Sequence, residues 1–563
     1  MERERLERER AEREQVEREQ VERERAERER LDRDRAEQER TEQERQEQEQ
    51  EFLFRRLKPV EAGYSLKSRC MDGTRQYLLN RIVDWVAKES GQESVLQRNT
   101  YWFYGSPGIG KTSLAHSICE NLDEQNYLAG AFFCRRDDPI LSEPINILPT
   151  FIHKLAMIFP PFRTIVAKHL RDHPNLTPES MKDSLFLDFL GSLPHRPEHS
   201  LVFVIDALDE CGNHRSRPGI LKALTSAAAQ APWLKIIITG RTEVDIQHFF
   251  DNLTQSSYLP YDLATDQEAA SDLRIFARSQ FNSVASLWHL DIPWPKESDF
   301  QRVISRANGL FIFIKTLALA LEGCEDPEEG LEAALLESAG TGLEPLYELY
   351  SSILKTQILH KSAKFQRMIG VLLTTSPYRT LCDETIAELA EVKPNLVKKW
   401  VDALSSLLYR DEAANGGIRV RHSSVYDFFV NQVDIRGADV QLGIDCLRVM
   451  TTQLRFNICK LEDSRLANAD VKDLPSRLKE NVSDPLQYSC LYWSNHLCVP
   501  SDNRDQCVLV LGSLKKFLEG LYPLFWVEVL SAMGMVPIGA PSLRRVLSLV
   551  RVSTPSACCQ FVF

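Results

Sequence analysis

The sequence predicts an α/β fold in which a parallel sheet carries helices on both faces and is followed by a long helical region. Two continuous apolar runs, over 201–205 and 234–238, are rich in β-branched residues and typical of strands buried on both faces. Stretches with helical spacing separate them, and this alternation favours a parallel sheet. After about Thr265 the pattern is helical nearly to the end of the sequence.

The predicted elements follow one another in the order that such a sheet requires. In chain order they are an amphipathic helix over 77–86, a strand over 101–104, a helix from about 112, a strand over 129–134, a helix over 147–159 and the two buried strands. A glycine-rich turn joins the first strand to the helix that follows it. A short stretch near 415–421 predicts a hairpin within the helical region.

The first 51 residues form a charged segment of low complexity, with 21 acidic and 14 basic side chains. Its unit is five residues long, so the apolar position moves by about 140° per step around a helix and makes no stripe. A good coiled coil needs a period of about 3.5 residues instead. Glutamate and arginine recur at i,i+4 in the order that stabilises an isolated helix. We expect a solvated charged helix or a disordered tail, with a rigid spacer or a weak self-association segment as alternatives.

Composition and charge exclude several classes of function. The 512 residues after this segment carry a net charge of only about −5, so no basic footprint of a nucleic-acid binder is expected. The 13 cysteines show no metal-ligand spacing and are typical of reduced thiols in a cytoplasmic protein. No apolar run has the length of a membrane span, and the charged start has no signal peptide.

The strongest motif is a complete Gly-x-x-x-x-Gly-Lys-Ser/Thr pattern between a predicted strand and a predicted helix. It consists of Gly105, Ser106, Pro107, Gly108, Ile109, Gly110, Lys111 and Thr112. Glycines let backbone N–H groups surround a β-phosphate, and the start of the helix adds partial positive charge. Lys111 is expected to neutralise the β- and γ-phosphates, Thr112 to bind Mg²⁺, and Ser113 to reach the α-phosphate. The motif therefore predicts a bound nucleoside triphosphate with Mg²⁺.

Two further signals lie at the carboxyl ends of the buried strands. Asp206 directly follows the run 201–205, at the sheet edge where ligands of parallel sheets bind, and is expected to hold Mg²⁺ through water. Either Asp209 or Glu210 could orient the attacking water, and the sequence does not choose between them. Arg241, after the run 234–238, is expected to contact the γ-phosphate and report its loss.

Together, these three motifs resemble the NACHT subgroup of STAND signalling NTPases, and in particular the large fungal NACHT proteins and the nephrocystin-type NTPase domain. Asp209 and Glu210 supply the second acidic pair that distinguishes the subgroup. The sequence departs from the family at Gly240 and Thr242, which replace the usual serine and proline on either side of the sensor arginine. The resemblance covers roughly residues 57–500.

The resemblance also implies roles for residues outside the three motifs. The segment from Cys70 to Arg75 is similar to the family's adenine-side loop, which implies that Thr74 and Arg75 line the base pocket. The segment Arg421-His422-Ser-Ser-Val-Tyr-Asp427 resembles the winged-helix motif whose histidine touches the β-phosphate in the diphosphate-bound resting state. His422 is therefore the candidate sensor of that state.

The resemblance further implies a domain plan. The predicted units are the charged tail over 1–51, a helical entry segment over 52–98, the NTPase domain over 99–262, a helical subdomain over 263–340, a winged-helix-like subdomain over 341–435 and a helical region over 436–563. The repeat arrays that often end family members are absent, so their role as sensor is expected to be lost, truncated or supplied by a partner.

The function implied is that of a cytoplasmic switch, which binds ATP or GTP with Mg²⁺ and hydrolyses it slowly. The family likeness implies that the triphosphate form self-associates into a homo-oligomer. Two alternatives stay open: a constitutive ATPase that remodels a protein partner, and a scaffold that nucleotide only stabilises. The sequence does not identify the base, the trigger or the downstream output.

Overall fold

The computed structural model describes residues 2–65, 68–88, 98–177, 183–253, 257–336, 342–356, 362–463, 465–497 and 504–552. Its centre is a five-stranded parallel sheet with the strand order β2-β3-β4-β1-β5. The strands are β1 (Thr100–Tyr104), β2 (Leu128–Phe133), β3 (Leu201–Asp206), β4 (Leu234–Gly240) and β5 (Tyr258–Asp262). The parallel sheet predicted from the apolar runs is confirmed.

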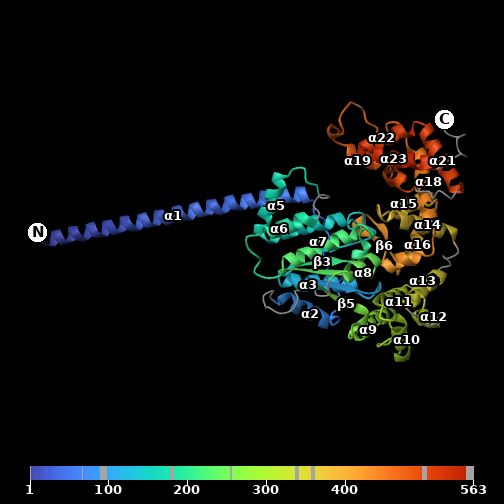
Figure 1. The fold of residues 1–563 in the computed structure, drawn as a ribbon, viewed down its shortest axis with the longest axis horizontal. Coiled ribbons are helices and arrows are strands. Elements are labelled where there is room, and N and C mark those ends of the chain that lie inside the picture. Colours follow the sequence, from blue (N-terminus) through green and yellow to red (C-terminus); the bar gives the residue numbers. More distant parts are fainter. Residues whose placement is uncertain are drawn as a thin grey trace.

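Helices cover both faces of the sheet, as predicted (Figure 1). One face packs against α2 (Gln76–Ala87) and α3 (Lys111–Glu124). The other packs against α4 (Ile147–Ile158), α5 (Pro160–Asp172), α6 (Asp183–Gly191), α7 (Arg217–Gln230) and α8 (Val244–Asp251). Two separate apolar cores result, one on each face of the sheet. Every residue of β3 and β4 is buried between them.

Strand β5 is the element that the sequence pattern missed. It lies at the edge of the sheet, and β1 is its one partner strand within the described residues. Its run contains Pro260, which cannot donate to a ladder, and four of its five residues are only half-buried or exposed. An edge strand of this kind lacks the continuous apolar run that revealed β3 and β4.

The helical region after the sheet divides into three groups that share one continuous apolar core. The first, the helical subdomain, holds α9 (Ala269–Trp288), α10 (Glu297–Ala307), α11 (Phe311–Glu322), α12 (Pro327–Leu336) and α13 (Glu344–Thr356). The last holds α18 (Ile435–Gln453), α19 (Leu474–Asn481), α20 (Asp484–Tyr492), α21 (Arg504–Glu519), α22 (Tyr522–Ala532) and α23 (Gly539–Val552). Within the described residues, no helix has both the length and the apolarity that a membrane crossing requires.

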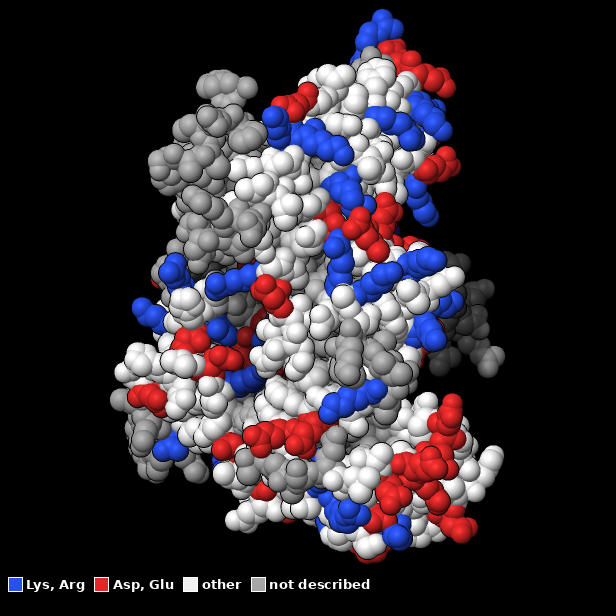
Figure 2. Space-filling model, turned by 90° about the vertical axis from the view of Figure 1, so that its right-hand side faces the viewer, with Lys and Arg blue, Asp and Glu red and all other residues white. Residues whose placement is uncertain are grey.

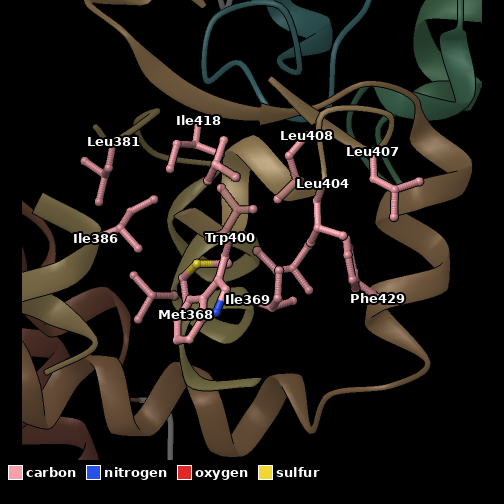
Figure 3. Close-up of a cluster of buried hydrophobic side chains, with 14 of the residues drawn as sticks. Met368, Ile369, Leu381, Ile386, Trp400, Leu404, Leu407, Leu408, Ile418 and Phe429 are labelled. Carbon is pink, nitrogen blue, oxygen red and sulfur yellow. The ribbon is translucent and has the colours of Figure 1, made fainter. Parts of the chain in front are cut away.

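The middle group has the order of a winged helix, three helices followed by a hairpin. It consists of α14 (Ala363–Thr375), α15 (Asp383–Leu389), α16 (Pro394–Ala403), the antiparallel strands β6 (Leu408–Asp411) and β7 (Gly417–Val420), and α17 (Ser423–Val430). Figure 3 shows its core, in which Trp400, Leu404 and Ile418 meet the side chains of α14 and α15. The hairpin predicted near 415–421 is thus confirmed and forms the wing.

The N-terminal segment is one long helix, α1 (Glu2–Leu57), which projects from the molecule as a rod (Figure 1). Its end is anchored rather than free, because Leu53 and Leu57 are buried against α4 and α5. The Arg56 guanidinium also donates to the carbonyl of Pro174 at 2.7 Å. The helical form of the charged segment is confirmed, but the helix passes the boundary predicted at 51, because its last two turns are apolar on the buried side.

Candidate functional site

The strand order brings the three predicted motifs to one edge of the sheet. Strand β4 lies between β1 and β3, so the turn after β1, Asp206 at the end of β3 and Arg241 after β4 are neighbours. Together with the helical and winged-helix groups they enclose a cavity of about 800 Å³. Its lining includes Thr74, Arg75, Pro107, Gly108, Ile109, Gly110, Lys111, Thr112, Ser113, Asp206, Asp209, Glu210, Arg241 and His422.

The glycine-rich turn has the backbone form that phosphate binding requires. Gly108 and Gly110 have φ values of 85° and 97°, in the left-handed region that side chains rarely adopt. Gly110, the N-cap of α3, has no side chain that could accept from the first N–H groups of the helix, and the residues of that first turn line the cavity. Gly105 and Ser106 do not line the cavity. Their carbonyls instead accept from the Lys111 ammonium, at 2.8 Å and 3.0 Å.

The Lys111 ammonium lies opposite the acidic strand ends. Burial lowers its pKa to about 8, and the carboxylates of Asp209 and Asp206 oppose that shift. Because its partners among the described residues are backbone carbonyls, the ammonium can turn to an incoming phosphate without breaking an ion pair.

Asp206 is fully buried and hydrogen-bonded on the cavity floor. Thr239 of β4 donates its hydroxyl to the Asp206 carboxylate, and Thr112 makes a second side-chain bond to it. Burial raises the pKa of Asp206 to about 6, against the lowering effect of these bonds and of Lys111. One carboxylate beside one hydroxyl is the partial oxygen set with which Mg²⁺ binds when water and phosphates complete its shell. The residues present therefore fit Mg²⁺ at Thr112 and Asp206.

The adjacent acids differ in what they contact. Asp209 accepts the backbone N–H of Arg241 at 3.0 Å and pairs with its Nε at 3.2 Å. Glu210 has a side-chain hydrogen bond to Ser423 of the winged helix, and burial together with Asp209 raises its pKa to about 7. Of the two, Asp209 is fixed by the arginine, whereas Glu210 is the carboxyl whose charge can change near neutral pH.

Arg241 connects the sheet edge to the winged helix. Its guanidinium forms an ion pair with Asp427 on α17, and Arg136 pairs with the same carboxylate at 3.2 Å. A second bridge joins Asp137 to Arg419 of β7 at 2.7 Å. Arg136 and Asp427 are site residues that no sequence motif predicted, although the charged run Arg-Arg-Asp-Asp, which only Cys134 separates from the end of β2, is a signal at this same sheet edge.

His422 lies over the glycine-rich turn from the winged-helix side. Its Nδ1 accepts the Ser424 N–H at 3.1 Å and so caps α17. Its Cε1 is 3.9 Å from the position that a Cβ on Gly108 would occupy. Burial lowers the pKa of His422 to about 3, and the charges of Lys111, Arg241 and Lys315 add to this effect. The imidazole is thus neutral near pH 7 and surrounded by cations.

The helical subdomain closes the cavity from another side. The backbone N–H of Ile312, in the first turn of α11, donates to the Gly108 carbonyl at 3.2 Å. Arg75 pairs with Asp266 and donates to the Ile109 carbonyl at 3.1 Å. Thr74 donates its hydroxyl to the Met71 carbonyl at 2.7 Å. Both Thr74 and Arg75 line the cavity. The Arg75 guanidinium is bound by Asp266 and the Ile109 carbonyl and so stabilises the glycine-rich turn.

Comparison with known proteins gives one family match. Residues 73–241 match the family model described as "Nephrocystin 3, N-terminal". This segment holds the glycine-rich turn, Asp206 and Arg241, so the predicted likeness to a nephrocystin-like NTPase domain is confirmed there. The likeness to fungal members stays a prediction. No curated protein matches the chain.

The solved structures that match this chain are distant from it. The Walker-type ATPase paby2304 of Pyrococcus abyssi has 14% identity and a TM-score of 0.31, and the match covers 66% of this chain and 99% of that one. The Aeropyrum pernix ORC1 protein in complex with DNA has 12% identity, a TM-score of 0.27 and coverages of 65% and 94%. A Thermotoga maritima RuvB mutant has 13% identity, a TM-score of 0.23 and coverages of 64% and 95%.

Proposed function

We propose that this protein is a switch of the STAND type, which binds a nucleoside triphosphate with Mg²⁺ and changes its arrangement with the state of the nucleotide. The observation that carries the proposal is the shared cavity. Its walls come from the NTPase sheet, from the helical subdomain and from the winged helix. A bound nucleotide therefore contacts all three units at once, and its chemical state affects how they pack together.

The phosphates have a defined place in this proposal. The amides from Gly108 to Thr112 bind the β-phosphate, and Lys111 leaves the carbonyls of its own loop to join the phosphates. Thr112 and Asp206 would hold Mg²⁺, which supplies positive charge to the β- and γ-phosphates. Ser113, in the first turn of α3, reaches the α-phosphate.

The switching step rests on competition for Arg241. In the closed arrangement its guanidinium is neutralised by Asp209 and Asp427. A γ-phosphate would offer Arg241 a stronger anionic partner and so weaken the contact with α17. A diphosphate lacks that group and leaves the closed arrangement intact, with the neutral His422 near the β-phosphate. The nucleotide shifts the equilibrium by no more than its difference in affinity between the two arrangements.

Hydrolysis would reset the switch, and Glu210 is the better candidate for the base that orients water. Both oxygens of Asp209 are engaged by Arg241, whereas the carboxyl of Glu210 faces the cavity with a pKa near the pH of a cell. Its contact with Ser423 ties it to the closed winged helix. We therefore propose slow hydrolysis, with Glu210 available only when the winged helix has moved away.

A role in nucleic-acid remodelling is not favoured. On the face shown in Figure 2, acidic and basic side chains are interspersed, and no continuous basic area runs across it. The formal net charge of the chain is −12. We propose a second copy of the chain as partner, through surfaces that opening uncovers, and a cytoplasmic location.

The proposal is tested by turnover and particle size, measured with ADP, ATP, GDP and GTP in the presence of Mg²⁺. A switch gives slow hydrolysis and larger particles with the triphosphate than with the diphosphate. Fast turnover at constant size would instead indicate a remodelling ATPase, and equal size without turnover a scaffold. Lys111→Ala should abolish triphosphate binding. The comparison of ATP with GTP also identifies the preferred base, whose pocket we propose Thr74 and Arg75 to line.

A further inference from the structure

Helix α11 presents a lysine to the cavity that the predicted motifs do not include. Lys315 lies three residues after Ile312, whose N–H donates to Gly108, so the two residues share one face of the helix. That face closes over the glycine-rich turn, and Lys315 lines the cavity there. Its side chain remains accessible rather than packed in the core.

Among the described residues, Lys315 differs from the other cations around the cavity in having neither an ion pair nor a hydrogen bond with the protein. Arg75 pairs with Asp266, Arg136 and Arg241 pair with Asp427, and Lys111 donates to two carbonyls. Within the described ranges, no carboxylate forms an ion pair with Lys315, and the charge that acts on its ammonium is that of another cation, Arg421. The cavity walls remove the ammonium partly from water, and this desolvation and the Arg421 charge both lower the pKa of Lys315. An anion in the cavity would relieve this crowding of like charges.

The position of His422 shows where that anion would lie. The imidazole is close enough to Lys111, Arg241 and Lys315 to feel the charge of each. It also lies beside Gly108 of the phosphate-binding turn. Three cations thus converge on the end of the cavity that would hold the outer phosphates of a nucleotide.

We propose that Lys315 is a second phosphate-binding lysine, which the helical subdomain adds to the one in the glycine-rich turn. This inference rests on the proposed function and deepens it. Because the lysine comes from α11, its contact requires the helical subdomain to stay against the turn, as the Ile312 hydrogen bond already holds it. A nucleoside monophosphate does not extend to this end of the cavity, so Lys315 selects nucleotides with two or more phosphates.

The test is calorimetric titration of the full chain with the mono-, di- and triphosphates of adenosine and guanosine. Lys315→Met should weaken diphosphate binding by about 10- to 100-fold, the range of one hydrogen bond between charged groups, and leave monophosphate affinity within about twofold. Lys315→Arg should restore most of the diphosphate affinity. Lys364→Met, which removes an exposed lysine on α14, is the matched control and should change nothing.

Three outcomes would overturn the inference. If Lys315→Met keeps the diphosphate affinity of wild type while Lys111→Ala loses it, Lys315 does not bind phosphate and the proposed function is unaffected. An equal loss for mono- and diphosphates, with a lowered unfolding temperature, would show a structural role only. Unchanged binding in both Lys315→Met and Lys111→Ala would remove the proposed function itself, and the inference with it.

Discussion

The guanidinium of Arg241, which follows the central strand β4, forms an ion pair with the carboxylate of Asp427 on α17. The same carboxylate also pairs with Arg136, at 3.2 Å. One acidic side chain of the winged helix thus pairs with two arginines of the sheet edge. The side chains of Arg241 and Asp427 are only 17% and 22% exposed, so solvent screens the pair incompletely.

Replacement of this carboxylate should loosen the closed arrangement. Asp427→Asn leaves Arg136 and Arg241 without their shared anion, and we expect a loss of about 1–2 kcal/mol from the contact. Bound diphosphate should then dissociate roughly tenfold faster, which a stopped-flow chase with a fluorescent diphosphate measures.

The control for this change is an ion pair that lies within the winged helix itself. Asp402→Asn removes the carboxylate that accepts from Arg410 at 2.6 Å and crosses no boundary between units. It should leave the dissociation rate unchanged. Equal rates in wild type and Asp427→Asn would show that the Arg241–Asp427 pair does not hold the units together.

The packing of α11 on the phosphate-binding turn can be tested at Gly108. A Cβ at this position would lie 2.1 Å from Cγ2 of Ile312, and the residue has a φ of 85°. Gly416, in the wing hairpin, has a φ of 75° but no atom within 4 Å of such a Cβ. Gly108→Ala should therefore lower the unfolding temperature by several degrees more than Gly416→Ala, because only the former adds a clash to the backbone strain. Equal shifts in a thermal scan would mean that Ile312 yields freely.

The raised pKa of Glu210 predicts a pH dependence of stability. Its pKa is about 7 in the fold, above its ordinary value of 4.5, because burial disfavours the charge. The fold therefore binds this proton more tightly than the unfolded chain does, and the stabilisation is complete below pH 4.5 and lost as the pH rises through 7. The glutamine of Glu210→Gln is neutral at every pH. The free energy of unfolding of this variant, relative to wild type, should therefore increase between pH 5 and 8 by on the order of 2 kcal/mol.

Urea unfolding of nucleotide-free, Mg²⁺-free protein at a series of pH values measures this difference. Glu268→Gln, which changes an exposed glutamate, is the control and should show no such trend. A constant difference between Glu210→Gln and wild type across the series would show that Glu210 does not titrate in this range.

Helix α1 has a buried C-terminal end and an exposed rod, and mutations can test the two parts separately. Leu53 is fully buried, whereas the neighbouring Phe54 is 58% exposed. Leu53→Ala should destabilise the NTPase domain by about 2–4 kcal/mol, and Phe54→Ala by much less. Removal of residues 2–45 should leave the unfolding temperature unchanged, since the side chains over 31–45 are exposed. A large shift on this truncation would indicate contacts of the rod that the structure does not show.

The sequence predicted the parts of the molecule that depend on local pattern. The two strands buried on both faces, the glycine-rich turn with α3, and the wing hairpin follow from runs of a few residues, and the structure contains each of them. The placement of Asp206 and Arg241 at one sheet edge with Lys111 also followed, because parallel strands end on the same side. The edge strand β5 did not, because its proline and half-exposed residues give no periodic signal.

Contacts between units could not be predicted in the same way. Arg241 and Asp427 are separated by 186 residues, and nothing near either one marks the other as its partner. The base-pocket role of Arg75 stays a prediction, whereas its contacts with Asp266 and the Ile109 carbonyl could be learned only from the fold. Lys315 lies in an apolar helix whose sequence gives no sign of a phosphate, so only the fold reveals its position.

The distance between the sheet domain and the winged helix tests the switch most directly. Dyes introduced at the exposed residues Lys168 on α5 and Lys399 on α16 would report this distance by energy transfer, with saturating ADP or with a non-hydrolysable triphosphate and Mg²⁺. We predict high energy transfer with ADP, because the closed arrangement keeps the two domains together, and lower energy transfer with the triphosphate. Identical transfer with both nucleotides bound would contradict the switch, because the γ-phosphate would then leave the Arg241–Asp427 contact in place.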